Sequence, residues 1–222
     1  MICGISETFM AEIIKIDFGR PHPALKNALD ILTNGGIVSF PTETFYGLGV
    51  NALDERAVNK IFRVKRRDIN KPLLIFIASK DQLSDLAKTV NVTAKKLIDC
   101  FWPGPLTLVF EATSKVPEVL TGNTGKIGVR VSGSGFVRQL CELSGFPITG
   151  SSANVSNKPE PASAVEVIKS LGDKIDLLLD GGKATGTQSS TVLDVCETLP
   201  KLIRQGIIGK DAIENVLGIR IK

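Results

Sequence analysis

The chain has 222 residues, of which 43% are hydrophobic and 23% are charged, and its formal net charge is +4. This composition supplies enough apolar material for a substantial core. The mild basic excess suits phosphate or nucleic-acid partners, although random surface charge accounts for it equally well.

No apolar run is long enough to span a bilayer and no secretory signal is present, so we expect a cytoplasmic protein without a membrane partner. The widely spaced cysteines contain no C-x-x-C pair, which argues against a zinc site; they are Cys3, Cys100, Cys141 and Cys196.

Apolar spacing along the chain alternates between the periods of strands and of helices. In chain order it predicts strand 13–18, helix 23–33, strand 37–40, a helix from the N-cap Asp54 to residue 62, strand 73–78, helices near 81–88 and 93–101, strands 106–111 and 127–131, helix 135–144, strand 147–150, helix 163–171, strands 176–180, 190–195 and 201–206, and a last helix at 210–217. We therefore predict one α/β domain over residues 11–222 with helices on both sides of a sheet. Residues 1–10 are predicted to be a disordered extension, and translation could start at Met1 or at Met10.

Polar side chains gather where several predicted strands end. Hydroxyl groups and a carboxylate follow the second strand in the run 41–44, and hydroxyl groups follow later strands at 151–154 and 188–191. Arg130 and Arg204 lie within otherwise apolar strands, and burying a guanidinium without a partner is costly. For one such arginine, a salt bridge inside the protein is about as plausible as an anionic ligand. For two beside hydroxyl-rich loops, we favour an anionic ligand.

A basic segment at residues 63–72 joins a predicted helix to a predicted strand. Its cations could be the solvated end of the helix, a surface that faces tRNA, or a clamp for a triphosphate. The sequence alone does not choose among these three readings.

The familiar catalytic motifs are missing. The chain has no G-x-x-x-x-G-K-[ST] loop, and its only histidine, His22, lies in an N-terminal turn. A Ser-His-Asp triad or a histidine metal cluster is therefore not expected. A Ser-Lys nucleophile at Ser151 or Ser152 stays open, although no S-x-x-K motif is present there. We expect no dedicated catalytic residue, because positioning and electrostatics on a nucleotide can supply the rate enhancement.

Six motifs occur in one order along the chain and resemble those of the YrdC/TsaC family, the L-threonylcarbamoyladenylate synthases. They are FPTETFYGLG (40–49), KRRDINKPL (65–73), FWPGPLTLVF (101–110), IGVRV (127–131), SSANVS (151–156), and SSTVLDV (189–195) with LIRQG (202–206). The resemblance implies a three-layer α/β/α domain with a twisted, mixed sheet of roughly seven strands and a concave basic face. It also implies a nucleotidyltransferase that makes threonylcarbamoyl-AMP and pyrophosphate from L-threonine, ATP and bicarbonate or CO2.

The same resemblance assigns ligand roles to individual residues. L-threonine is expected to contact Thr42, Lys71, Arg130, Ser152 and Ser190. ATP is expected to contact Lys65, Arg67, Asn154 and Arg204, and Mg²⁺ is expected to arrive with the ATP phosphates instead of being held by protein ligands.

The product is expected to serve threonylcarbamoyl-adenosine modification of tRNA through a downstream transfer complex. Two other readings stay open. The chain could be an RNA-binding relative without synthase activity, or a relative of the carbamoyl-transfer module in hydrogenase-maturation proteins. Pyrophosphate release that needs threonine, bicarbonate and ATP together separates the synthase from an RNA binder, whose affinity should fall steeply with salt.

Overall fold

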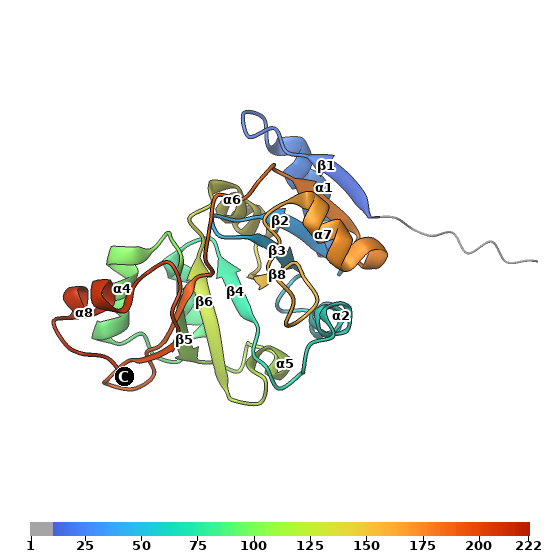
Figure 1. Cartoon of the computed structure of the whole chain (residues 1–222). Coiled ribbons are helices and arrows are strands. Elements are labelled where there is room, and N and C mark those ends of the chain that lie inside the picture. Colours follow the sequence, from blue (N-terminus) through green and yellow to red (C-terminus); the bar gives the residue numbers. More distant parts are fainter. Residues whose placement is uncertain (1–10) are drawn as a thin grey trace, which may run out of the picture.

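The computed structural model describes residues 11–222, which fold into two mixed β-sheets flanked by helices (Figure 1). The predicted extension at residues 1–10 lies outside the described residues. The mixed α/β class is confirmed. The described strands, however, divide between two sheets of five and six strands, where the resemblance implied a single sheet of about seven.

The first sheet has the strand order β1-β9-β2-β3-β8. Its strands are β1 (Glu12–Lys15), β2 (Val38–Pro41), β3 (Tyr46–Gly49), β8 (Ser151–Ser152) and β9 (Leu177–Asp180). Strands β3 and β8 were not predicted, because glycine and serine are poor strand formers by themselves. They form through pairing with distant partners: β3 lies antiparallel to both β2 and β8.

The second sheet has the strand order β11-β10-β5-β6-β4-β7. Its strands are β4 (Leu74–Ile77), β5 (Leu106–Glu111), β6 (Lys126–Val131), β7 (Ile148–Thr149), β10 (Thr191–Asp194) and β11 (Lys201–Arg204). Gly150 alone separates β7 of this sheet from β8 of the first sheet. The Gly150 amide donates to Leu74 O at 2.8 Å, and the Thr149 amide donates to Val50 O at 3.0 Å. This short segment therefore links the two sheets.

The helices cover the outer faces of the sheets (Figure 1). They are α1 (His22–Thr33), α2 (Glu55–Lys65), α3 (Leu83–Leu86), α4 (Val92–Phe101), α5 (Glu118–Thr121), α6 (Gly135–Ser144), α7 (Ala164–Leu171) and α8 (Lys210–Leu217). The predicted helix at 81–88 is instead a 3-10 turn, Lys80–Gln82, followed by the four-residue α3. None of the helices in residues 11–222 has the length and apolar character needed to cross a membrane.

Helix α2 shows how local sequence fixes an element that carries part of the basic segment. The Asp54 carboxylate accepts hydrogen bonds from the amides of Arg56 and Ala57 at 2.9 and 3.2 Å, which caps the helix as predicted. Arg66 ends the helix in the left-handed conformation, with φ at 49°. The chain therefore turns sharply between Lys65 and Arg67, and the side chains of these two residues point in different directions.

The two faces of the second sheet have different environments. Side chains of β5 and β6 alternate between the faces, as the pleat of a strand requires. Leu106, Leu108 and Phe110 pack into the core with α4 and α8, whereas Thr107 and Val109 line an open cavity. One face of this sheet is thus a core surface, and the other is the floor of a candidate site.

Candidate functional site

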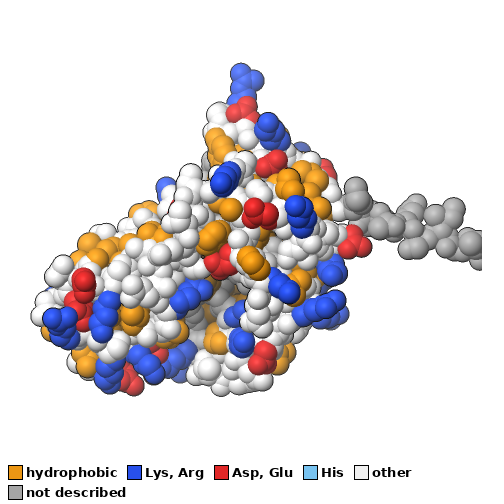
Figure 2. Space-filling view, in the orientation of Figure 1, with side chains coloured by type: hydrophobic (Ala, Val, Ile, Leu, Met, Phe, Trp, Pro, Cys, Tyr) orange, Lys and Arg blue, Asp and Glu red, His pale blue; other side chains and the backbone are white. Residues whose placement is uncertain are grey.

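A cavity of about 420 Å³ lies between the floor of the second sheet and the loops that leave the first sheet. Figure 2 shows Lys and Arg side chains around the hollowed centre of this face, in line with the expected concave basic face. Six of the nine predicted ligand residues line the cavity: Thr42, Arg67, Arg130, Ser152, Ser190 and Arg204. The fold thus brings together side chains that lie as far as 162 residues apart in the chain, although their ligand roles stay predictions.

Arg130 is the most enclosed of the cationic residues of the cavity. Its side chain on β6 is 3% exposed, its guanidinium lies 4.9 Å from the ring centre of Phe76, and its Nη2 lies 3.1 Å from Glu43 Oε1. Burial lowers the pKa of Arg130, and the negative charge of Glu43 opposes that shift. The Nε and Nη2 atoms nevertheless have no aligned hydrogen-bond partner. The salt-bridge reading of the sequence is therefore confirmed for Arg130, and the anionic-ligand reading stays a prediction.

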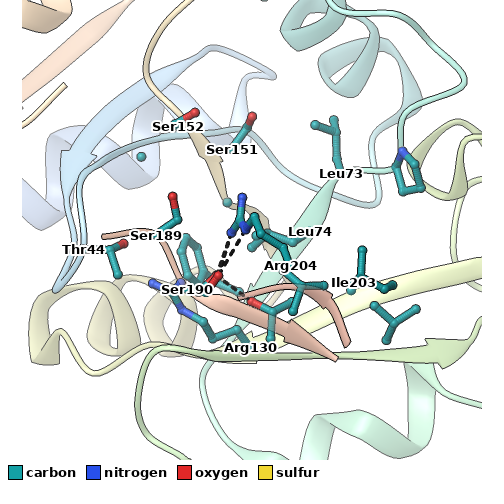
Figure 3. Close-up of a pocket in the computed structure, with 18 of the residues that line it drawn as sticks. Thr44, Leu73, Leu74, Arg130, Ser151, Ser152, Ser189, Ser190, Ile203 and Arg204 are labelled. Carbon is teal, nitrogen blue, oxygen red and sulfur yellow. Dashed lines mark hydrogen bonds between the residues drawn. The ribbon is translucent and has the colours of Figure 1, made fainter. Parts of the chain in front are cut away.

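Arg204 and Ser190 form a second polar group at the cavity (Figure 3). Arg204 donates from Nη2 to Ser190 O and Oγ at 2.9 and 3.2 Å. The Ser190 hydroxyl also lies 3.0 Å from the hydroxyl of Thr107 on β5. These contacts fix the guanidinium of Arg204 at the rim of the cavity.

Arg67 lies near enough to Arg204 for their charges to interact. Burial lowers the pKa of Arg67, Asp68 opposes this, and the like charge of Arg204 lowers it further. Arg67 also donates to Pro72 O at 2.7 Å, which holds its side chain against the loop before β4. Two neighbouring guanidinium groups at one cavity suit a ligand that carries several negative charges, such as a polyphosphate.

Lys65, by contrast, does not line the cavity. Its side chain is 1% exposed, and its ammonium donates to the backbone oxygen of Ser152, to Asn154 O at 2.7 Å and to Asn154 Oδ1 at 3.1 Å. Burial and the nearby charge of Arg67 lower the pKa of Lys65 to about 7, while Glu160 acts in the opposite direction. Lys65 therefore holds the 151–156 loop from behind.

Asn154 and Lys71 also lie outside the cavity lining. The Asn154 side chain accepts from Ser152 Oγ at 2.6 Å and donates to the backbone oxygens of Lys158 and Pro159. Lys71 is exposed on the loop between α2 and β4. Thr42 does line the cavity, but its hydroxyl already donates to Phe45 O at 2.7 Å within its own turn.

Several cavity residues were not predicted from the sequence. Lys126 and Asp194 form an ion pair at 2.7 Å on the floor, and Glu160 accepts a hydrogen bond from Ser189 Oγ at the wall. The two residues of the first pair lie 68 residues apart in the chain, and those of the second pair lie 29 residues apart. The local spacing of the sequence therefore does not predict either contact. The alternation of Lys126 with Arg130 along one strand was the available signal, because both then face the same side.

The floor also contains an apolar strip, which we call the apolar row: Leu74, Gly128 and Val109. These residues are register partners on three adjacent strands, and Asp194 continues the row on β10. Gly128 lies two residues from Arg130 along β6, which corresponds to about 7 Å. A flat apolar surface thus lies beside the cationic groups.

Comparison with known proteins places this arrangement in a family. The Sua5/YciO/YrdC family model, described as telomere recombination, matches residues 30–206. The threonylcarbamoyl-AMP synthase of Pyrococcus abyssi is 45% identical over 198 residues, which make up 89% of this chain and 58% of that protein. A putative threonylcarbamoyl-AMP synthase of Methanocaldococcus jannaschii is 38% identical over 177 residues, 80% of this chain and 83% of that protein.

Solved structures agree with the sequence comparison. The crystal structure of P. abyssi Sua5 complexed with L-threonine matches with a TM-score of 0.91 and 43% identity, over 95% of this chain and 62% of that one. E. coli YciO matches with a TM-score of 0.81 and 25% identity, over 92% of this chain and all of that one. The chain spans less than two thirds of the length of the P. abyssi protein. From the family model, the identities and the shared fold, we conclude that the chain belongs to the Sua5/YciO/YrdC family.

Proposed function

We propose that this chain is a nucleotidyltransferase that makes threonylcarbamoyl-AMP and pyrophosphate from L-threonine, ATP and CO2 or bicarbonate. The product would serve threonylcarbamoylation of tRNA. The observation that carries the proposal is the similarity over 95% of the chain to a Sua5 structure that is complexed with L-threonine. The cavity supports it, because the guanidinium of Arg130 lines it and suits a carboxylate, and two further arginines suit a polyphosphate.

The reaction divides into two displacements. First, the threonine nitrogen attacks the carbon of CO2 and loses a proton, which gives a carbamate. A carbamate oxygen then attacks the α-phosphorus of ATP, and the bond to the bridging oxygen breaks as pyrophosphate leaves. With bicarbonate in place of CO2, one molecule of water is also released.

The residues of the cavity would orient these reactants and balance their charge. Arg130 would hold the threonine carboxylate, while Arg67 and Arg204 would face the phosphates. The apolar row would carry the adenine ring, because its residues give the floor of the cavity an apolar surface. Holding reactants in line can contribute about 7–11 kcal/mol to lowering a barrier, so the site does not need a dedicated base.

Magnesium would enter as part of the MgATP substrate, where it would neutralise charge on the leaving pyrophosphate. Within residues 11–222 no group of three or more His, Cys, Asp or Glu side chains could hold a metal ion.

The direct test is pyrophosphate release measured with each substrate omitted in turn. We expect release only when L-threonine, bicarbonate and MgATP are all present, and mass spectrometry should detect threonylcarbamoyl-AMP. Release that does not depend on threonine would contradict the proposal. Binding to tRNA without any release, with an affinity that falls steeply with salt, would favour the RNA-binding alternative.

A further inference from the structure

We infer that Glu43 is a positioning residue, which fixes the guanidinium of Arg130 at the cavity so that it faces the carboxylate of the amino-acid substrate. The inference rests on the proposed function and extends it to a residue with no assigned role. Glu43 comes from the turn between β2 and β3 of the first sheet, whereas Arg130 comes from β6 of the second sheet. Their contact therefore crosses from one sheet to the other.

The carboxylate of Glu43 is itself held in one place. It accepts hydrogen bonds from Ser132 Oγ at 2.5 Å, from the Gly133 amide at 2.8 Å and from the Ser134 amide at 3.3 Å. A side chain at position 133 would crowd it, because a Cβ built there lies 3.1 Å from Glu43 Cγ. The loop after β6 is thus shaped to receive this carboxylate.

Glu43 is ionised under ordinary conditions. Burial raises its pKa, but the charge of Arg130 and the hydrogen bonds from Ser132 and Gly133 outweigh burial and leave the pKa of Glu43 lower than is usual for a glutamate. Arg130 therefore has a fixed negative charge on one side and the ring of Phe76 against its face. These two contacts define the plane of the guanidinium.

The same contacts decide which part of Arg130 can meet a ligand. Nε and Nη2 are shielded from solvent and have no hydrogen bond of good geometry, and Nη2 is ion-paired with Glu43 at 3.1 Å. The part of the guanidinium left for a ligand is therefore the part that lines the cavity. A guanidinium held in one plane keeps its geometric match to a planar carboxylate, which a mobile guanidinium loses.

The role of Glu43 could instead be only to neutralise Arg130, and the two roles predict opposite results. If Glu43 only neutralises, its removal leaves a stronger positive charge and threonine should bind more tightly. If Glu43 positions the guanidinium, its removal frees the side chain and threonine should bind more weakly. The direction of the change in Glu43→Gln decides, because glutamine keeps the size and removes the charge.

The experiment measures pyrophosphate release while L-threonine and ATP are titrated separately. In Glu43→Gln we expect the KM for threonine to rise by about 10-fold or more, with the KM for ATP within about twofold of the wild type. Ser132→Ala, which removes one hydrogen bond to Glu43 and keeps its charge, should raise the KM for threonine by a smaller factor. The exposed Glu55→Gln is the matched control and should change neither value. An unchanged or lower KM for threonine in Glu43→Gln overturns the inference.

A second measurement separates this inference from the proposed function. Calorimetric titration with L-threonine and with L-threoninamide, which lacks the carboxylate, needs no turnover. The wild type should prefer threonine, and Glu43→Gln and Ser132→Ala should lose part of that preference. If the wild type releases no pyrophosphate, the proposed function fails, but this titration still supports or overturns the role of Glu43.

Discussion

At the scale of single residues, Arg130 and Lys65 are both buried cations, and the structure gives them different surroundings. Arg130 lines the cavity and is ion-paired with Glu43, whereas the ammonium of Lys65 has three oxygen partners in the 151–156 loop and does not line the cavity. Burial alone therefore does not identify a ligand-binding cation. Access to the cavity separates the two cases.

Removing the Arg130 side chain should weaken threonine use selectively. A charge-assisted hydrogen-bonded pair contributes about 1.5–3 kcal/mol, so Arg130→Ala should raise the KM for threonine by about 10- to 150-fold while ATP binding stays near normal. Arg130→Lys should restore little, because an ammonium does not offer two parallel donors. Steady-state titration of each substrate gives the result. A loss of folding stability with an unchanged threonine KM would show that the pair with Glu43 is only structural.

Removing the Lys65 ammonium should instead destabilise the fold. Lys65→Met leaves the oxygens of Ser152 and Asn154 without their buried donor, which should cost about 1–3 kcal/mol in the free energy of unfolding. Lys71→Met, at an exposed position of the same segment, is the control and should change it by less than about 0.5 kcal/mol. Urea denaturation monitored by circular dichroism measures both. Normal stability with a selective loss of ATP affinity would favour the phosphate-binding role that the sequence suggested.

At the scale of elements, Gly128 keeps the cavity face of the second sheet flat at its position, because glycine has no side chain. A Cβ there would lie 3.3 Å from Thr107 Cγ2 and 3.4 Å from Leu74 Cβ, and the two methyl groups of valine would rise into the cavity. Gly128→Val should therefore weaken nucleotide binding by at least about 10-fold, equivalent to about 1.4 kcal/mol. Gly209→Ala, where nothing lies within 4 Å, is the control. Equal nucleotide affinity in both variants, measured by calorimetry, would show that the base does not lie on the apolar row.

Elements with strong local signals were predicted well from the sequence. Strand β5 and helices α6 and α8 have the predicted bounds, and Asp54 caps α2 as expected. The strands β3 and β8 and the four-residue helix α5 were missed. Their residues adopt these conformations because of partners far away in the chain, and no propensity or spacing rule reports such partners.

The residues of the candidate site likewise fall into those that could be predicted from the sequence and those that could not. Motif residues that point into the cavity, such as Arg130 and Arg204, could be found from the sequence because an arginine in an apolar strand is unusual. The direction of Lys65 could not, because it depends on the left-handed turn at Arg66. The ion pair of Lys126 with Asp194 could not be found either, since it joins two strands that are not sequence neighbours.

At the scale of the whole molecule, the cavity lies between two sheets, so a ligand that fills it should stabilise the entire fold. A ligand at 100 times its dissociation constant adds about 2.7 kcal/mol to the free energy of unfolding. For a chain of this length that corresponds to a rise in Tm of about 5–10 °C. We expect this rise with saturating L-threonine in the wild type, and a smaller one in Arg130→Ala at the same concentration. Differential scanning fluorimetry measures both, and equal shifts would mean that threonine binds elsewhere.

The link at Gly150 has a consequence for the speed of binding. Hydrogen bonds from the amides of Gly150 and Thr149 tie the two sheets together, and a Cβ at position 150 would lie 2.4 Å from Leu74 Cδ1, so the junction is tightly packed. The two walls of the cavity are therefore held at one separation before any ligand arrives. A preformed site needs no slow isomerisation to admit its ligand. In a stopped-flow experiment, the observed rate of threonine association should rise linearly with concentration in a single exponential phase, and a rate that levels off would reveal a closing motion of the sheets.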